Sequence, residues 1–164
     1  MINFRLMDNK NVEEVMNVYS KAYTWDKEKK CFLCNQESID ELSLSQNYAM
    51  YDNHDLIGYG SVTPVVKNLQ TYMVIRRKFR TSEKTPMDKI GEACIIIHPD
   101  YRNQGCGNKL LQHLIQESKI NYESMVAYIV TNNLPSISLV RKHDFEFRCR
   151  HNKENFYEKK LFLI

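Results

Sequence analysis

Hydrophobic and polar positions in the first part of the chain follow the strand period in some stretches and the helix period in others. Residues 4–6 alternate briefly and predict a first strand, and the apolar series within residues 12–19 predicts a helix. A charged stretch at residues 24–44 carries apolar side chains at helical spacing and predicts a second helix. Residues 48–51 and 56–66 flank a turn-rich tetrapeptide and therefore predict two antiparallel strands.

The pattern is less regular in the segment that follows. Residues 71–75 are rich in β-branched and aromatic side chains, which favour a strand, while residues 81–88 are polar and turn-like. We interpret residues 67–88 as an inserted hairpin or a flap.

The strongest periodic signals lie in the second half of the chain. An apolar stretch at residues 90–97 predicts a buried strand that ends at His98-Pro99, and an amphipathic helix follows at residues 107–119. Four more elements are expected, namely a strand at 124–130, a helix at 136–142 and strands at 145–150 and 156–162. This order predicts an α/β fold, a single domain over residues 1–164 with a mixed, mostly antiparallel twisted sheet flanked by helices.

Composition and charge narrow the class of protein. A chain of 164 residues with 43% hydrophobic residues can bury one core, which agrees with a single domain. Its 23 basic and 20 acidic residues give a formal charge of +3, too small an excess for a nucleic-acid surface, so we expect no nucleic-acid partner. An RNA-associated role for the basic run at residues 76–80 is the weakest alternative, and it would show salt-dependent binding.

The N-terminus and the cysteines indicate the compartment. The first residues lack a secretory signal and no apolar run reaches membrane-spanning length, so we expect a cytoplasmic protein without a membrane partner. The five cysteines suggest no complete disulfide framework, and reduced thiols are expected. Cys31 and Cys34 have metal-ligand spacing, but no second Cys or His pair follows at the expected distance, so we expect no metal.

The loop between the strand at 90–97 and the next helix combines the features of an anion site. The backbone N–H groups of residues 104–108 have no partner inside that helix. Gly105 and Gly107 would let a ligand approach the backbone closely, and Arg102 adds a positive charge. These features predict that the loop binds a pyrophosphate.

Two other phosphate-binding motifs fail on their spacing. A P-loop needs Ser or Thr after its Gly-Lys pair, whereas Lys109 follows Asn108 and precedes Leu110. The dinucleotide fingerprint needs a third glycine three positions after Gly107, and Leu110 stands there.

The loop instead resembles the acetyl-CoA loop of the GNAT family of N-acetyltransferases, in which Arg/Gln-x-x-Gly-x-Gly/Ala follows a strand that ends in an apolar-x-Pro turn. Ile97-His98-Pro99 and Arg102-x-x-Gly105-x-Gly107 match both parts. A second match, Asn133-Leu-Pro-Ser136-Ile-Ser-Leu139-Val-Arg-Lys142-His-Asp-Phe145, resembles the family's Asn-x-x-Ala/Ser-x-x-Leu-Tyr-x-Lys-x-Gly-Phe. The resemblance covers nearly the whole chain, is specific over residues 92–145, and does not cover residues 67–88.

This resemblance implies acetyl-CoA as the co-substrate, held without a metal. The strand at 90–97 and the strand at 124–130 would splay apart, and the pantetheine arm would pair with main-chain groups near Ile95 and Ile97. A main-chain N–H there would also stabilise the oxyanion that forms when an amine attacks the thioester. The cofactor-binding residues it implies are Ile95, Ile97, Arg102, Asn103, Gln104, Gly105, Cys106, Gly107, Asn108, Asn133 and Ser136.

Two catalytic positions also follow from the resemblance. Glu92 lies where some family members carry a general-base glutamate, and it would accept a proton from the amine directly or through water; a rim carboxylate or a structural ion pair is the equally open alternative. The tyrosine that protonates the leaving thiolate in many members is replaced by Val140, so Ser138, Ser136, another tyrosine or water would act instead. Asp144 stands where the family usually has glycine.

The function expected from the sequence is an acetyl-CoA dependent N-acetyltransferase that moves an acetyl group to a primary amine by direct attack. The acceptor would be a small-molecule amine or a peptide amine, bound by residues 23–45 and 67–88. Because Val140 replaces the usual acid, a catalytically silent module that binds or senses acyl-CoA is the alternative. We expect a monomer or a homodimer.

Overall fold

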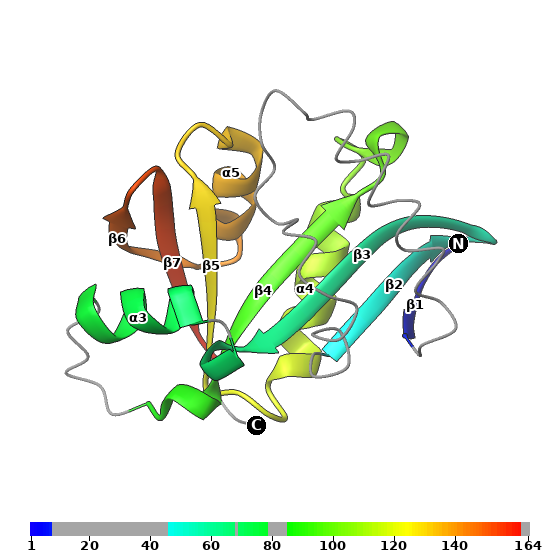
Figure 1. Cartoon of the computed structure of the whole chain (residues 1–164). Helices are drawn as coiled ribbons and strands as arrows, with labels where there is room; N and C mark the ends of the chain where they lie inside the picture. Colours follow the sequence, from blue (N-terminus) through cyan, green and yellow to red (C-terminus); the bar gives the residue numbers. More distant parts are fainter. Residues whose placement is uncertain (8–45, 68, 79–84, 162–164) are drawn as a thin grey trace. The chain divides into compact units, whose positions relative to one another are not determined.

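The computed structural model describes residues 1–7, 46–67, 69–78 and 85–161 of the chain (Figure 1). The two helices expected within residues 8–44 lie outside the described residues, as do Cys31 and Cys34. The described elements are β1 (Ile2–Leu6), β2 (Gln46–Asp52), β3 (Asp55–Pro64), η1 (Val65–Lys67), α3 (Leu69–Lys78), η2 (Met87–Lys89), β4 (Ile90–Ile97), η3 (Pro99–Tyr101), α4 (Cys106–Ser118), β5 (Ser124–Val130), α5 (Leu134–Lys142), β6 (Glu146–His151) and β7 (Glu154–Lys160).

The strands form one sheet of seven, in the order β1-β2-β3-β4-β5-β7-β6. β1 pairs antiparallel with β2, and β7 pairs antiparallel with both β5 and β6. β4 and β5 are parallel. The sheet is therefore mixed and mostly antiparallel, which confirms the predicted fold class.

The first of two compact units comprises residues 1–61 and 94–114 in their described parts. Its core contains Met50, Ile57, Cys106 and Leu110, with Ile95 and Ile97 packed against them. α4 lies along the back of β3 and β4 in Figure 1, and it approaches β3 closely at Gly60. A Cβ atom added at Gly60 would lie 2.9 Å from Leu114 Cδ1, so glycine permits this helix-to-sheet contact.

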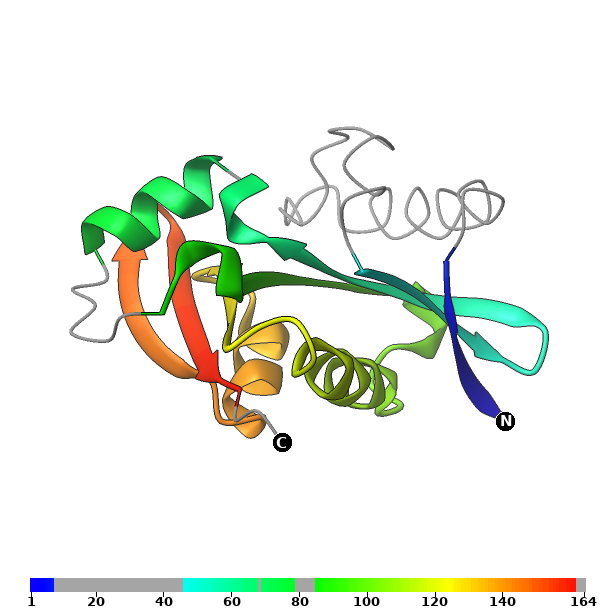
Figure 2. The same ribbon diagram turned by 90° about the horizontal axis from the view of Figure 1, so that it is seen from below.

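The second compact unit comprises residues 62–93 and 115–164 in their described parts. α3 and α5 cover opposite faces of the β5-β7-β6 sheet (Figure 2). On the α3 face, Val74 and Ile75 join a buried cluster with Ile90, Val126 and Phe156. On the other face α5 contributes two buried side chains, Ile137 and Val140.

The segment at residues 67–88 differs from its prediction. The strand expected at residues 71–75 is wrong, because these residues lie inside the helix α3, and the described part of the segment contains helices in place of a hairpin. Thr71, Val74 and Ile75 are buried and stand at i, i+3 and i+4, so they form the inward face of a helix. Packing of that face on the sheet outweighs the strand propensity of the individual residues.

The elements in the second half of the chain agree closely with the sequence patterns. β4 and β5 have the predicted bounds, and α4 starts and ends one residue before the predicted helix. α5 begins two residues earlier than predicted, at Leu134. Cys94, Cys106 and Cys149 are free thiols. In the described parts of the chain, no helix combines the length and the apolar composition needed to cross a membrane.

Candidate functional site

The loop that precedes α4 has a backbone shaped by two left-handed residues. Asn103 has φ of 60° and Gly105 has φ of 80°. Arg102 Nε donates a 3.1 Å hydrogen bond to the carbonyl oxygen of Ile97, at the end of β4. Gln104 Nε2 donates a 2.8 Å hydrogen bond to the carbonyl oxygen of Asp100. The loop is thus held on both sides of Asn103 while its backbone turns into the helix.

The N-terminus of α4 can receive an anion. The first turn contains no acidic residue, so nothing in it neutralises the positive end of the helix dipole. The intrahelical pattern starts with the N–H of Lys109, which donates to the carbonyl oxygen of Gly105 at 3.1 Å. A Cβ atom built on Gly105 would meet nothing within 4 Å, so a ligand has room beside this residue. These features fit a phosphate group.

The cofactor-binding residues predicted in the first unit differ in how much of their surface is exposed. Gln104 and Gly105 are exposed, and Gly107 is half-buried in the first turn of α4. Cys106 is buried in the core of the unit, so only its backbone remains available to a ligand. Asn103 is exposed, and Ile95, Ile97, Arg102 and Asn108 are half-buried.

Tyr101 lies directly before Arg102 and was not singled out by the sequence. Desolvation and the carboxylates of Asp55, Asp52 and Asp100 raise the pKa of its phenol, and Asp55 also accepts a hydrogen bond from it. The Tyr101 ring makes an edge contact with His98, with the ring centroids 5.9 Å apart. The β2-β3 turn supplies two of these carboxylates, and no local pattern in the sequence indicates that the turn lies near residue 101.

Asn133 and Ser136 belong to the second unit, at the junction of β5 and α5. Asn133 is the N-cap of α5, and its Oδ1 accepts a 3.3 Å hydrogen bond from the Ser136 N–H. The Asn133 N–H donates to the carbonyl oxygen of Val130 at 2.9 Å. The amide oxygen of Asn133 therefore caps the helix, whereas its Nδ2 group is suited to donate to a ligand.

Three further positions of the second motif lie on or after α5. Ser138 is exposed, and Val140 is buried with 6% of its surface accessible. Asp144 has φ of 61°, so it adopts the left-handed conformation that glycine favours at the end of a helix. Its neighbour Phe145 donates its N–H to the carbonyl oxygen of Val140 at 3.1 Å. The aspartate thus preserves the turn.

Glu92 is half-buried on β4, in the second unit. Its Cα partner on β5 is Val126, and adjacent residues in register point to the same face of a sheet, so Glu92 faces the α3 side with Val126. The β4-β5 ladder contains the pairs from Ile90 to Glu92 and ends there, although β5 continues to Val130.

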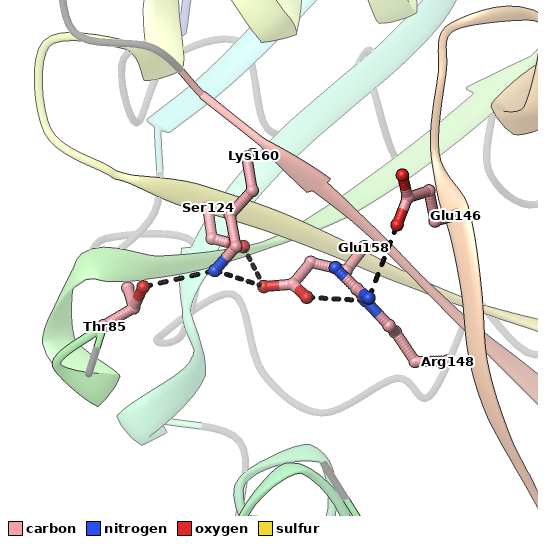
Figure 3. Close-up of polar contacts among 6 residues, drawn as sticks. All are labelled: Thr85, Ser124, Glu146, Arg148, Glu158 and Lys160. Carbon is pink, nitrogen blue, oxygen red and sulfur yellow. Dashed lines mark hydrogen bonds and ion pairs between the residues drawn. The ribbon is translucent and has the colours of Figure 1, made fainter. Parts of the chain in front are cut away.

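A polar network lies on the same face (Figure 3). Glu158 is buried on β7 and accepts hydrogen bonds from Ser124 Oγ at 2.5 Å and from Arg148 Nε at 2.8 Å. Lys160 Nζ lies 3.2 Å from Glu158 Oε1 and donates to Thr85 Oγ1 at 3.3 Å. No local pattern in the sequence indicates this network, because its members come from four separate segments of the chain, namely Thr85, β5, β6 and β7.

Comparison with known proteins agrees with these observations. A family model described as the acetyltransferase (GNAT) family matches residues 12–145. The GNAT domain of S. lividans PAT is similar with a TM-score of 0.74 and 12% identity, over 98% of this chain and 90% of that chain.

Two more solved structures share the fold. A protein from Salmonella typhimurium, named as a candidate acetyltransferase and solved with its cofactor acetyl-CoA, has a TM-score of 0.66 and 18% identity, over 98% of this chain and 94% of that chain. The ribosomal-protein-S18-alanine N-acetyltransferase from Escherichia coli has a TM-score of 0.64 and 15% identity, over 96% of this chain and 91% of that chain.

Proposed function

The chain belongs to the GNAT family of acetyltransferases, and from this premise we propose that it is an acetyl-CoA dependent N-acetyltransferase in which a primary amine attacks the thioester directly. The observation that carries the proposal is the open backbone at Gly105, directly before the N-terminus of α4. That end of the helix offers backbone N–H groups and no competing carboxylate in its first turn, as a pyrophosphate requires.

The residues that would hold acetyl-CoA are those at the two helix starts. The backbone of residues 104–108 would bind the pyrophosphate, with Arg102 adding charge beside it. Asn133 would donate from Nδ2 to the pantetheine arm, with Ser136 beside it, and the main chain near Ile95 and Ile97 would pair with the arm. When bound, acetyl-CoA supplies an activated acetyl group as a thioester.

We assign Glu92 the role of general base. An alkyl amine is protonated near neutral pH, and it must lose a proton before it can attack a carbonyl carbon. Glu92 is a half-buried carboxylate on the parallel strand that ends at the loop, so it would accept that proton directly or through one water. The departing thiolate would take a proton from the Ser138 hydroxyl as that hydroxyl takes up another from water, to which Ser138 is exposed. The buried Val140 side chain has no proton to give.

The acceptor would be the primary amine of a small molecule or of a peptide. One structural relative is an N-acetyltransferase of a ribosomal-protein alanine, and another is named as a candidate phosphinothricin N-acetyltransferase, which supports keeping both acceptor classes in the proposal. Cytoplasmic location and a monomeric or homodimeric state stay predictions.

The test is a thiol-release assay with acetyl-CoA and a panel of amines, run for the wild type, Glu92→Gln and the control Glu146→Gln. Glu146 is 73% exposed at the side chain and lies on the β6 edge strand, so its replacement should leave turnover unchanged. We expect Glu92→Gln to lower kcat about 100-fold, within the range for loss of a general base. Binding of acetyl-CoA without turnover on any amine would favour the silent sensing module, and absence of binding would refute the proposal.

A further inference from the structure

Two glutamates of β7 lie on the same face of the sheet but differ in their hydrogen-bonding partners. Glu154 and Glu158 stand four residues apart, so both side chains leave the strand on the α3 side of the sheet. Glu158 is satisfied by Ser124, Arg148 and Lys160, as Figure 3 shows. Two carboxylates in such different environments are expected to have different roles.

Glu154 is buried without a matching donor. Its exposed fraction is 8%, close to that of Glu158 at 7%. Within the part of the chain that the structure describes, its side chain makes no hydrogen bond or ion pair, and its one electrostatic partner there is His151. Burial raises the pKa of Glu154, and the nearby His151 offsets part of that effect. Partial desolvation of a carboxylate costs stability, so a binding role would explain its presence.

The register places Glu154 level with the end of β5, just before the start of α5. Glu154 is the Cα partner of Val130, the last residue of β5, and Val130 accepts the N–H of Asn133. Tyr128 and Phe156 form the next pair on the same face of the two strands, with stacked rings whose centroids lie 5.7 Å apart. The Tyr128 ring therefore lies between the level of Glu92 and the level of Glu154 on one face.

The two carboxylates are too far apart to bind one ammonium group together. Glu92 is level with Val126 and Glu154 is level with Val130, a difference of four residues, or about 13 Å along the strand. β4 and β7 are separated by β5, which adds about 10 Å across the sheet. The two Cα atoms are therefore about 16 Å apart, and an acceptor that touches both glutamates needs two separate groups.

We propose that Glu154 is a specificity-determining residue that binds a second cationic group of the acceptor, so that the preferred acceptor is a long diamine or a larger polycationic amine. The inference rests on the proposed function, because it takes Glu92 as the general base beside the reacting amine. Tyr128 is half-buried, with its ring stacked on Phe156 and packed against the cluster under α3. The chain of the acceptor would pass the part of this ring that stays exposed, which can contact alkyl groups and cations.

The test compares two acceptors of equal length, an eight-carbon diamine with an amine at each end and the eight-carbon amino alcohol with a hydroxyl at one end. For the wild type we expect a KM about tenfold lower for the diamine, as a charge-assisted contact predicts. Glu154→Gln should raise the KM of the diamine about tenfold and leave the KM of the amino alcohol and of acetyl-CoA unchanged. Glu146→Gln is the control, since its side chain is 73% exposed on the neighbouring strand.

A second measurement needs no turnover. The diamine should raise the Tm of the wild type and of Glu146→Gln, with or without coenzyme A, but not the Tm of Glu154→Gln. Equal KM values for the two acceptors, or an equal shift of Tm in all three proteins, would overturn the inference even if turnover supports the proposed function. A selective shift in a protein without turnover would support the binding role of Glu154 while refuting the proposed function.

Discussion

Arg148 occupies the extra position of a β-bulge in β6, and its Nε donates a 2.8 Å hydrogen bond to Oε2 of Glu158 on β7. Phe147 and Cys149 pair with consecutive residues of β7, so Arg148 has no partner of its own in the ladder. The bulge lets Arg148 reach the buried carboxylate, while Cys149 still packs against the cluster under α3.

Removal of this contact should destabilise the fold. Arg148→Gln leaves the buried Glu158 with Ser124 and Lys160 as partners, and we expect the free energy of unfolding to fall by about 1.5–3 kcal/mol, the range for a hydrogen bond to a charged group. Urea unfolding monitored by circular dichroism measures the change. The control is Arg150→Gln, because Arg150 Nε donates a 3.0 Å hydrogen bond to the neutral Asn155 Oδ1. An equal loss in both variants would contradict the special role of the bulge.

Backbone conformation at Gly105 should control ligand binding. Gly105→Ala places a Cβ on a residue with φ of 80°, which costs about 1–2 kcal/mol, and it also obstructs the approach to the helix N-terminus. We expect a lower Tm and weaker acetyl-CoA binding, measured by calorimetry.

The matched variant for that prediction is Asn103→Gly. Asn103 has φ of 60°, so glycine there should keep the Tm close to that of the wild type. Unchanged affinity in Gly105→Ala would mean that the ligand does not approach this residue.

Asn133 has two roles that can be separated. Asn133→Ala removes the cap of α5 and should lower the free energy of unfolding by about 1 kcal/mol. Asn133→Asp keeps an oxygen for the Ser136 N–H but lacks the amide donor, so stability should be retained while the Kd for acetyl-CoA rises. Chemical unfolding and calorimetry report the two effects. Full affinity in Asn133→Asp would exclude Asn133 as a donor to the ligand.

Much of the fold could be predicted because local signals and packing agree in the second half of the chain. β4 is continuous and apolar, and Pro99 follows its end, so its bounds can be read directly. Residues 71–75 show the limit of this approach, since their strand propensity conflicts with the helical spacing of Thr71, Val74 and Ile75. Packing against the sheet determines whether such a segment forms a strand or a helix, and this packing cannot be read from the segment alone.

The candidate site could be predicted where it consists of a continuous motif. The loop at residues 102–107 carries its glycines and its arginine in order, and the structure places them at a helix N-terminus. Tyr101 and Glu154 were missed, because their surroundings come from a distant turn and from strand register. Asp144 shows the opposite case, in which an unexpected residue adopts the conformation that the motif needs.

The stability of the protein should depend on pH through Glu154. Its pKa is raised by burial from the ordinary value of 4.5, so the folded state favours the protonated form. The protonated carboxyl contributes its full stability at pH values below the pKa that Glu154 has in the unfolded chain. That contribution is lost as the pH rises through the higher pKa that Glu154 has in the folded protein. Glu154→Gln, which mimics the neutral form, should therefore have a higher Tm than the wild type near neutral pH, and the difference should disappear below about pH 4.5.

Thermal unfolding of both proteins across this pH range measures the effect. His151 is included in the design because it lowers the pKa of Glu154, whereas burial raises it. His151→Gln removes that offset, so the Tm difference between the glutamate and glutamine forms should be larger in its background. A structural role for the carboxylate predicts the reverse, a lower Tm for Glu154→Gln near neutral pH. The sign of the difference therefore separates a residue retained for binding from one retained for stability.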